Sequence, residues 1–251
     1  MTSRTRFGLG CWVVIAVAMG LRLWFPGATI ITVDEPTWVG RSKDFRSAVS
    51  SGDYASAVAA PRGAHGTRPG VTTMIVGAVA VELEEAKGVT DPVAQLRTAK
   101  QIMAVLGSLW LLPFMAAAAR LFGRRAGLIA GGIMAVEPLM VGHGRLLHTD
   151  GLLTVSAATA TLALLVVFEV LRHRGSDGSH DRGSQRAWLR WALLAGFAAG
   201  FAFATKLTAG QSPVAWWKSR CGPRCVQPSM AGWSGSVSRG SVSSAMELSE
   251  R

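Results

Sequence analysis

The sequence predicts an all-α fold, a polytopic transmembrane helical bundle with about five spans, and two observations carry that prediction. Of the 251 residues, 49% are hydrophobic and only 16% are charged. The apolar residues also form gapless runs close to the roughly 20 residues that a helix needs to cross a bilayer. A soluble helix would place polar residues at every third or fourth position, and these runs do not. We therefore expect an integral, multi-pass membrane protein.

The runs of near-spanning length, of which the third is the shortest, cover residues 8–25, 102–119, 126–141, 152–171 and 188–205. The first run follows a basic start, but no small-residue cleavage site comes before the bulky Leu23. It is therefore interpreted as a retained anchor and not as a removed signal peptide.

The net charge of +11 is distributed between the spans. Arginines lie before the first run, between the second and third, and between the fourth and fifth, whereas the gap between the third and fourth holds only Arg145. By the positive-inside rule the N-terminus is cytoplasmic, and the loops 26–100 and 142–151 are external. Because the basic residues do not line one soluble face, we expect no nucleic acid as partner. The expected location is the cell (plasma) membrane.

The external loop 26–100 is far longer than a loop that merely connects two elements. We expect it to carry short interfacial helices. Residues 36–50 are predicted to form one, with Asp34 or Thr37 as its N-cap. Residues 71–83 are apolar but too short to span, so they are expected to lie in the interface or re-enter it.

Two groups of polar residues next to the spans are candidates for a site. Asp34 and Glu35 form an adjacent pair of carboxylates just beyond the first span. The connector 142–151 includes Arg145, His148 and Asp150 between two apolar spans. Each group has a structural alternative, since Asp34 suits a helix cap and the residues Thr149 or Asp150 suit the N-cap of the fourth span.

The last 41 residues differ in character from the rest. Residues 1–210 form the predicted membrane region, whereas 211–251 are rich in Ser, Gly, Arg, Pro and Trp and have no apolar period. Such a composition buries too little surface to fold, so a disordered, non-homologous tail is expected. The abrupt change is typical of a reading-frame shift or a truncated gene.

The sequence gives little indication of a metal or cofactor. Cys221 and Cys225 form a C-x-x-x-C pair without matching partners, and the acids and histidines are interpreted as not having metal-ligand spacing. We therefore expect no required metal and no cofactor.

Several motifs occur in an order that resembles the N-terminal part of the polyprenyl-phosphate-sugar-dependent glycosyltransferases. These GT-C membrane enzymes include the protein O-mannosyltransferases and the aminoarabinose transferases. The motifs, which span residues 1 to about 210, are Asp34-Glu35, Arg68-Pro69-Gly70-Val71-Thr72-Thr73-Met74, Arg120-Leu121-Phe122-Gly123-Arg124-Arg125, Arg145-Leu146-Leu147-His148-Thr149-Asp150 and Thr205-Lys206.

The resemblance implies residue roles. An acid in the first external loop is the proposed base of that family, which puts Asp34 in the base role with Glu35 as its support. The family's basic residue before a proline, which contacts the lipid phosphate, falls on Arg68. The resemblance further implies inverting transfer of a hexose or pentose from a polyprenyl-phosphate donor to a protein, glycolipid or glycan acceptor.

The chemistry of such a transfer fits the other polar residues near the expected external face. A carboxylate must take a proton from the acceptor hydroxyl, and fixed cations must stabilise the departing phosphate. Arg97, Arg145 and Lys206 are further cation candidates, with membrane anchoring as the alternative for Lys206. His148 and Asp150 are candidates for orienting the acceptor or the base.

Two other classes of function stay open at this point. The tail favours a truncated, catalytically inactive membrane protein or scaffold. A transporter segment would place paired charges at mid-membrane depth, whereas here the charges are near the ends of the spans.

Overall fold

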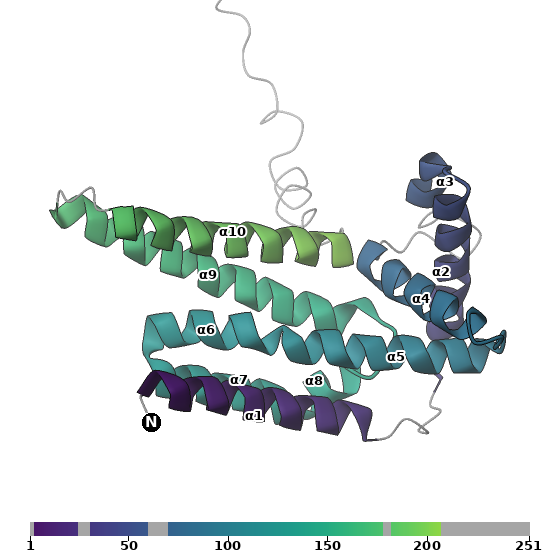
Figure 1. The fold of residues 1–251 in the computed structure, drawn as a ribbon, viewed down its shortest axis with the longest axis horizontal. Helices are drawn as coiled ribbons and strands as arrows, with labels where there is room; N and C mark the ends of the chain where they lie inside the picture. Colours follow the sequence, from purple (N-terminus) through teal and green to yellow (C-terminus); the bar gives the residue numbers. More distant parts are fainter. Residues whose placement is uncertain (1–2, 25–30, 60–69, 178–181, 207–251) are drawn as a thin grey trace, which may run out of the picture. The chain divides into compact units, whose positions relative to one another are not determined.

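In the computed structural model, residues 3–24, 31–59, 70–177 and 182–206 are described, and every regular element among them is a helix (Figure 1). The chain divides into two units, Met1–Gly210 and Gln211–Arg251. The second unit lies outside the described residues, so the disordered tail stays a prediction. The all-α prediction is confirmed.

The helices, in chain order, are α1 Ser3–Leu23, α2 Glu35–Ser50, α3 Tyr54–Ala59, α4 Val71–Glu85, α5 Pro92–Leu109, α6 Leu111–Phe122, α7 Arg124–Val136, α8 Pro138–His143, α9 Thr149–Asp177 and α10 Arg182–Thr205. Four stretches of the described chain are long and apolar enough to cross a membrane, namely Thr5–Leu23, Pro92–Phe122, Thr149–His173 and Trp188–Thr205. By this measure the described chain has four candidate spans, whereas about five were predicted.

The predicted third span, 126–141, is broken into α7 and α8. Pro138 has no backbone N–H and cannot continue the hydrogen-bond ladder of α7. Glu137 caps the new helix instead, since its Oε2 accepts a hydrogen bond from the N–H of Met140 at 2.7 Å. The 13 residues of α7 rise about 20 Å at 1.5 Å per residue, short of a hydrocarbon core of about 30 Å.

The second span begins earlier than predicted. Asp91 caps α5 by accepting hydrogen bonds from the N–H groups of Val93 and Ala94, and Pro92 occupies the first turn. The helix continues through Trp110 into α6. Arg97 and Lys100 therefore lie on the helix and not before it, because the cap and the proline start the helix ten residues ahead of the apolar run.

The loop between the first two spans carries short helices, as predicted. The predicted helix 36–50 is α2, and the apolar stretch 71–83 is α4. The two helices approach closely, because a Cβ added at Gly77 would lie 2.0 Å from the Oγ of Ser42.

The turn after α4 is held by Glu84, which accepts hydrogen bonds from Lys87 at 2.9 Å and Thr98 at 2.6 Å. These bonds, that from Lys87 first, hold the pKa of Glu84 below its usual value.

The helix ends of the first unit gather at two opposite ends of the bundle (Figure 1). The last turn of α1, the N-terminal half of α5, the start of α9 and the end of α10 lie at one end, together with α2 and α4. We call this end the site rim, residues 34–38, 70–73, 95–100, 143–150 and 205–206. The other end, the basic rim, comprises residues 3–6, 120–125 and 169–173.

Candidate functional site

Glu35, the first residue of α2, is fully buried and joins three parts of the chain. Its Oε2 accepts a hydrogen bond from the N–H of Thr32 at 2.8 Å. Its Oε1 accepts one from the N–H of Leu147 at 3.1 Å and lies 3.0 Å from the Nζ of Lys100. Because a buried carboxylate needs both a counter-charge and hydrogen bonds, these contacts fix its position. Glu35 thereby holds the first loop, α5 and the α8–α9 turn together.

Asp34 precedes Glu35 and is more exposed to solvent. It occupies the N-cap position of α2 and is half-buried, but its carboxylate makes no capping hydrogen bond. Pro36 lies in the first turn and has no N–H for a cap to satisfy. The sequence-based alternative that Asp34 is only a helix cap therefore lacks the hydrogen bond that defines a cap.

The turn between α8 and α9 brings its polar residues to the site rim. Leu147 is fully buried beside Glu35. The Nδ1 of His148 accepts a hydrogen bond from the N–H of Asp150 at 3.3 Å. Because α9 begins at Thr149, His148 is the residue that flanks the helix and caps it. The expectation that Thr149 or Asp150 is the cap was wrong by one or two positions.

The carboxylate of Asp150 is used in another way. Its Oδ1 accepts hydrogen bonds from the Nζ of Lys206 at 2.9 Å and from the Oγ1 of Thr149 at 3.3 Å. Its Oδ2 lies 3.4 Å from the Nδ1 of His148. The pair of Asp150 and Lys206 joins α10 to the start of α9. Since both side chains are more than a third exposed, the pair adds little stability but fixes the ammonium group in place.

The end of α10 also contacts the start of α4. Thr205 is fully buried, and its Oγ1 donates a hydrogen bond to the Oγ1 of Thr72 at 3.1 Å. Gly70, just before α4, packs against the side chains of Trp38 and Thr149, since a Cβ there would lie 2.4 Å from the indole. Segments from five places in the sequence therefore meet at the site rim.

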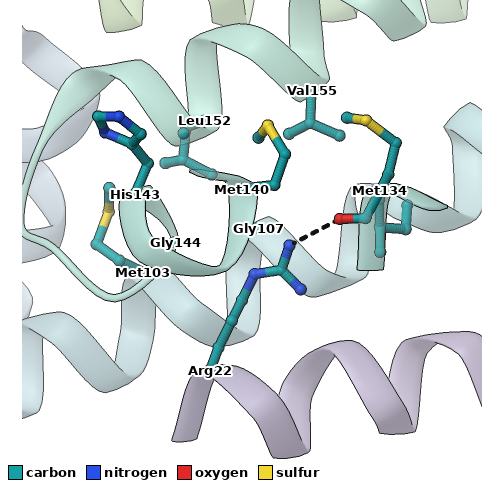
Figure 2. Close-up of a pocket in the computed structure, with 11 residues that line it drawn as sticks. Arg22, Met103, Gly107, Met134, Met140, His143, Gly144, Leu152 and Val155 are labelled. Atoms are coloured by element: carbon teal, nitrogen blue, oxygen red, sulfur yellow. Dashed lines mark hydrogen bonds between the residues drawn. The ribbon is translucent and has the colours of Figure 1, made fainter. Parts of the chain in front are cut away.

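Arg145 and Arg22 bind helix carbonyls beside this rim. The guanidinium of Arg145 donates to the backbone oxygen of Leu21, at 3.1 Å from its Nε. Arg22 donates to Met134 O at 3.4 Å, the carbonyl that Pro138 leaves without an N–H four residues later (Figure 2). Each arginine therefore satisfies a carbonyl near the end of a helix.

Arg22 lies in the last turn of α1 and is only 5% exposed. It lines a pocket together with Met134, Met140, His143 and Gly144 (Figure 2). A Cβ added at Gly144 would lie 2.5 Å from the Nε of Arg22. Glycine at this position therefore lets the guanidinium pack beneath the turn.

Two predicted site residues remain, Arg97 and Arg68. Arg97 lies on an exposed face of α5. Arg68, the expected phosphate ligand, lies outside the described residues. The structure thus joins His148, Asp150 and Lys206 at the start of α9. Glu35 contacts the turn that carries Arg145 through the N–H of Leu147, and Asp34 is next to Glu35 in the chain.

Sequence reasoning missed Lys100 and the buried role of Arg22. Lys100 was placed in a connector before the second span, although the Asp91-Pro92 pair is a helix-start signal that would have put it on a helix. No local pattern connects Lys100 to Glu35, because the two are far apart in sequence and meet only through tertiary packing.

Comparison with known families now adds an independent finding. A comparison with curated proteins and one with solved structures found no match. The model of the family described as dolichyl-phosphate-mannose-protein mannosyltransferase matches residues 83–215, more than half of the chain. The matched region includes Lys100, Arg145, His148, Asp150 and Lys206 of the site rim, and stops short of the first loop with its two acids. The chain therefore belongs to the dolichyl-phosphate-mannose-protein mannosyltransferase family, a family of GT-C glycosyltransferases.

Proposed function

We propose that this chain is a glycosyltransferase, or the N-terminal part of one, that transfers a sugar from a polyprenyl-phosphate donor to an acceptor hydroxyl at the site rim. The family description favours mannose as the sugar and a protein as the acceptor. The site rim would lie on the extracytoplasmic face, with the N-terminus and the basic rim in the cytoplasm. The plasma membrane is the proposed location.

The contact between Glu35 and the N–H of Leu147 carries this proposal. It ties the loop that contains Asp34 to the turn that contains Arg145 and His148. Lys206 joins the same turn region through Asp150. A carboxylate and several cations are thereby collected at one end of the bundle, which is the arrangement that sugar transfer from a lipid phosphate requires.

In the proposed reaction Asp34 takes the proton of the acceptor hydroxyl. The acceptor oxygen forms a bond to the anomeric carbon as the bond from that carbon to the phosphate oxygen breaks, so the configuration inverts. The lipid phosphate leaves with the electron pair. Lys206 and Arg145, with Arg68 by resemblance, would stabilise its charge. Glu35 is a positioning residue, because its oxygens are occupied by other groups.

The activity test uses the purified full-length chain and a polyprenyl-phosphate-linked mannose. Asp34→Asn should lower the rate of transfer about 10²- to 10⁴-fold, the usual contribution of a general base. Asp44→Asn is a matched control, because Asp44 is an exposed carboxylate on the same helix. Equal rates for the wild type and Asp34→Asn would remove Asp34 from the base role. A wild-type chain that transfers no sugar would favour the scaffold alternative.

The orientation is tested separately by labelling single cysteines with a membrane-impermeant reagent. Replacing Cys11, Cys221 and Cys225 with serine gives a background without thiols. Val33→Cys and Gly142→Cys, both exposed positions near the site rim, should be labelled from outside. Labelling of the two positions from opposite sides of the membrane would contradict the proposed site.

A further inference from the structure

We propose that His143, His148 and Asp150 bind a divalent transition-metal ion, for which zinc is the best fit. The three residues come from the end of α8, the turn and the first turn of α9. One possible ligand atom from each lies within 4.8 Å of those from the other two. This group belongs to the part of the chain that the structure describes.

The contact between His148 and Asp150 already has the dimensions of a metal site. The Nδ1 of His148 and the Oδ2 of Asp150 are 3.4 Å apart. Two ligands bonded at about 2.0–2.1 Å to a tetrahedral zinc ion lie about 3.3 Å from each other. The observed separation therefore needs almost no adjustment for an ion to bridge the two atoms.

A hydrogen bond does not explain this contact while the ring is neutral. The Nδ1 of His148 accepts the N–H of Asp150, so it cannot also donate a proton to the Asp150 carboxylate. Two acceptors then face each other, and a cation between them would satisfy both. At 3.3 Å, the hydrogen bond from Asp150 is longer than most N–H hydrogen bonds and would be exchanged for the metal bond at small cost.

His143 supplies the third ligand. Its Nδ1 is buried and has no hydrogen-bond partner among the described residues. A buried polar atom without a partner is unfavourable, so coordination through Nδ1 would remove that cost. The centroids of the His143 and His148 rings are 6.3 Å apart. A rotation of the His143 side chain would bring its nitrogen from 4.8 Å or less to the ligand spacing.

The donor set determines which ion fits. Two imidazoles and one carboxylate favour zinc and related transition metals, whereas magnesium and calcium prefer oxygen ligands. His143 and His148 are separated by four residues, within the spacing of three to five found for paired histidine ligands of zinc. Three protein ligands would leave one coordination position open to water or an anion.

The surrounding residues also fit a bound ion. Asp150 uses its Oδ1 for Lys206 and Thr149, which leaves Oδ2 directed at His148. Outer contacts of this kind hold a ligating carboxylate in place. Lys206 is one of these contacts, so the position of the Asp150 carboxylate depends on its ammonium group.

The experiment measures binding of Zn²⁺ alone to the full chain, purified in detergent without a histidine tag. Cys221 and Cys225 are replaced by serine so that the tail thiols cannot contribute. Calorimetry should give one saturable site. Co²⁺ bound in its place should show the visible absorption of a site with mixed nitrogen and oxygen ligands.

Substitutions then identify the ligands. His143→Ala, His148→Ala and Asp150→Asn should each weaken binding at least about tenfold, since even changes in outer-shell contacts cost about 10- to 100-fold. His173→Ala, an exposed histidine at the far end of α9, is the matched control and should bind as the wild type does. Thermal unfolding checks that each variant is folded and should show stabilisation by Zn²⁺ only where the site is intact.

The proposal is overturned if Zn²⁺ does not saturate, or if folded His143→Ala and Asp150→Asn bind as the wild type does. Equal affinity of the His173→Ala and His143→Ala variants would likewise assign the ion to another site. Because the readout is metal binding, absence of sugar transfer leaves the result unaffected. The proposal departs from the sequence-based expectation of no metal. The spacing of His143 and His148 was already compatible with zinc, and the fold adds the carboxylate of Asp150 to the two rings.

Discussion

The two rims of the bundle differ in how deeply their ion pairs are buried. At the site rim, Glu35 is fully buried and Lys100 is only 18% exposed, and the two are 3.0 Å apart. At the basic rim, Arg120 and Glu169 are 47% and 35% exposed and 3.7 Å apart. Losing one partner of a buried ion pair lowers the stability of the fold more than losing one partner of an exposed pair.

The difference in burial reflects different roles for the charged residues of the two rims. The basic residues at 120–125 are exposed and close to a turn at Gly123, whose φ of +92° favours glycine. They need only to be charged to act as topology signals. The site rim instead requires specific partners from distant parts of the chain, because its carboxylate is bonded to particular groups.

The largest effect is expected for Glu35→Ala, which removes the fully buried carboxylate that pairs with Lys100. Losing one partner of a buried ion pair costs about 3–5 kcal/mol. The measurement is the free energy of unfolding in detergent. In the double variant Glu35→Ala with Lys100→Met, part of the loss should return, because no uncompensated charge remains. A single variant as stable as the wild type would contradict the buried pair and would make the two rims equivalent.

An intermediate loss of stability is expected for a substitution at Gly127, where α6 and α7 are in contact near the basic rim. A Cβ at Gly127 would lie 2.7 Å from Met115 O and 2.8 Å from Ala119 N, both backbone atoms that cannot move alone. Gly127→Ala should therefore destabilise by about 1–3 kcal/mol. Gly132→Ala on the same helix meets nothing within 4 Å. It should be neutral or stabilise by about 0.5–1 kcal/mol, the usual preference for alanine over glycine in a helix.

Chemical denaturation of the two glycine variants gives this comparison directly. If both lose the same amount of stability, the close approach of α6 and α7 is incorrect. In that case the basic rim would be held by its charges and not by backbone packing.

The smallest effect is expected for Arg120→Ala. Its partner Glu169 is partly exposed, so the pair should contribute at most about 1 kcal/mol, and less at high salt. Thermal unfolding at low and high ionic strength is the measurement. A loss as large as that of Glu35→Ala would mean that the basic rim also has a positioning role.

Parts of this structure follow from local patterns in the sequence. The break at Glu137-Pro138 was predictable because proline cannot donate the hydrogen bond that continues a helix. The same kind of signal, Asp91-Pro92, marks the start of α5 and was overlooked in favour of the longer apolar run. The two candidate clusters, 34–35 and 145–150, were identified from their density of polar residues between apolar runs.

The sequence by itself determined the membrane-spanning character of the chain and its helical class, because spanning length and hydrophobicity are properties of contiguous residues. It also placed acids and bases near the ends of the spans. Only the tertiary structure decided that Glu35 pairs with Lys100, that His148 and not Asp150 caps α9, and that Arg22 is buried. Each of these depends on contacts between residues distant in sequence or on the residue at which a helix begins, and hydrophobic periodicity contains neither.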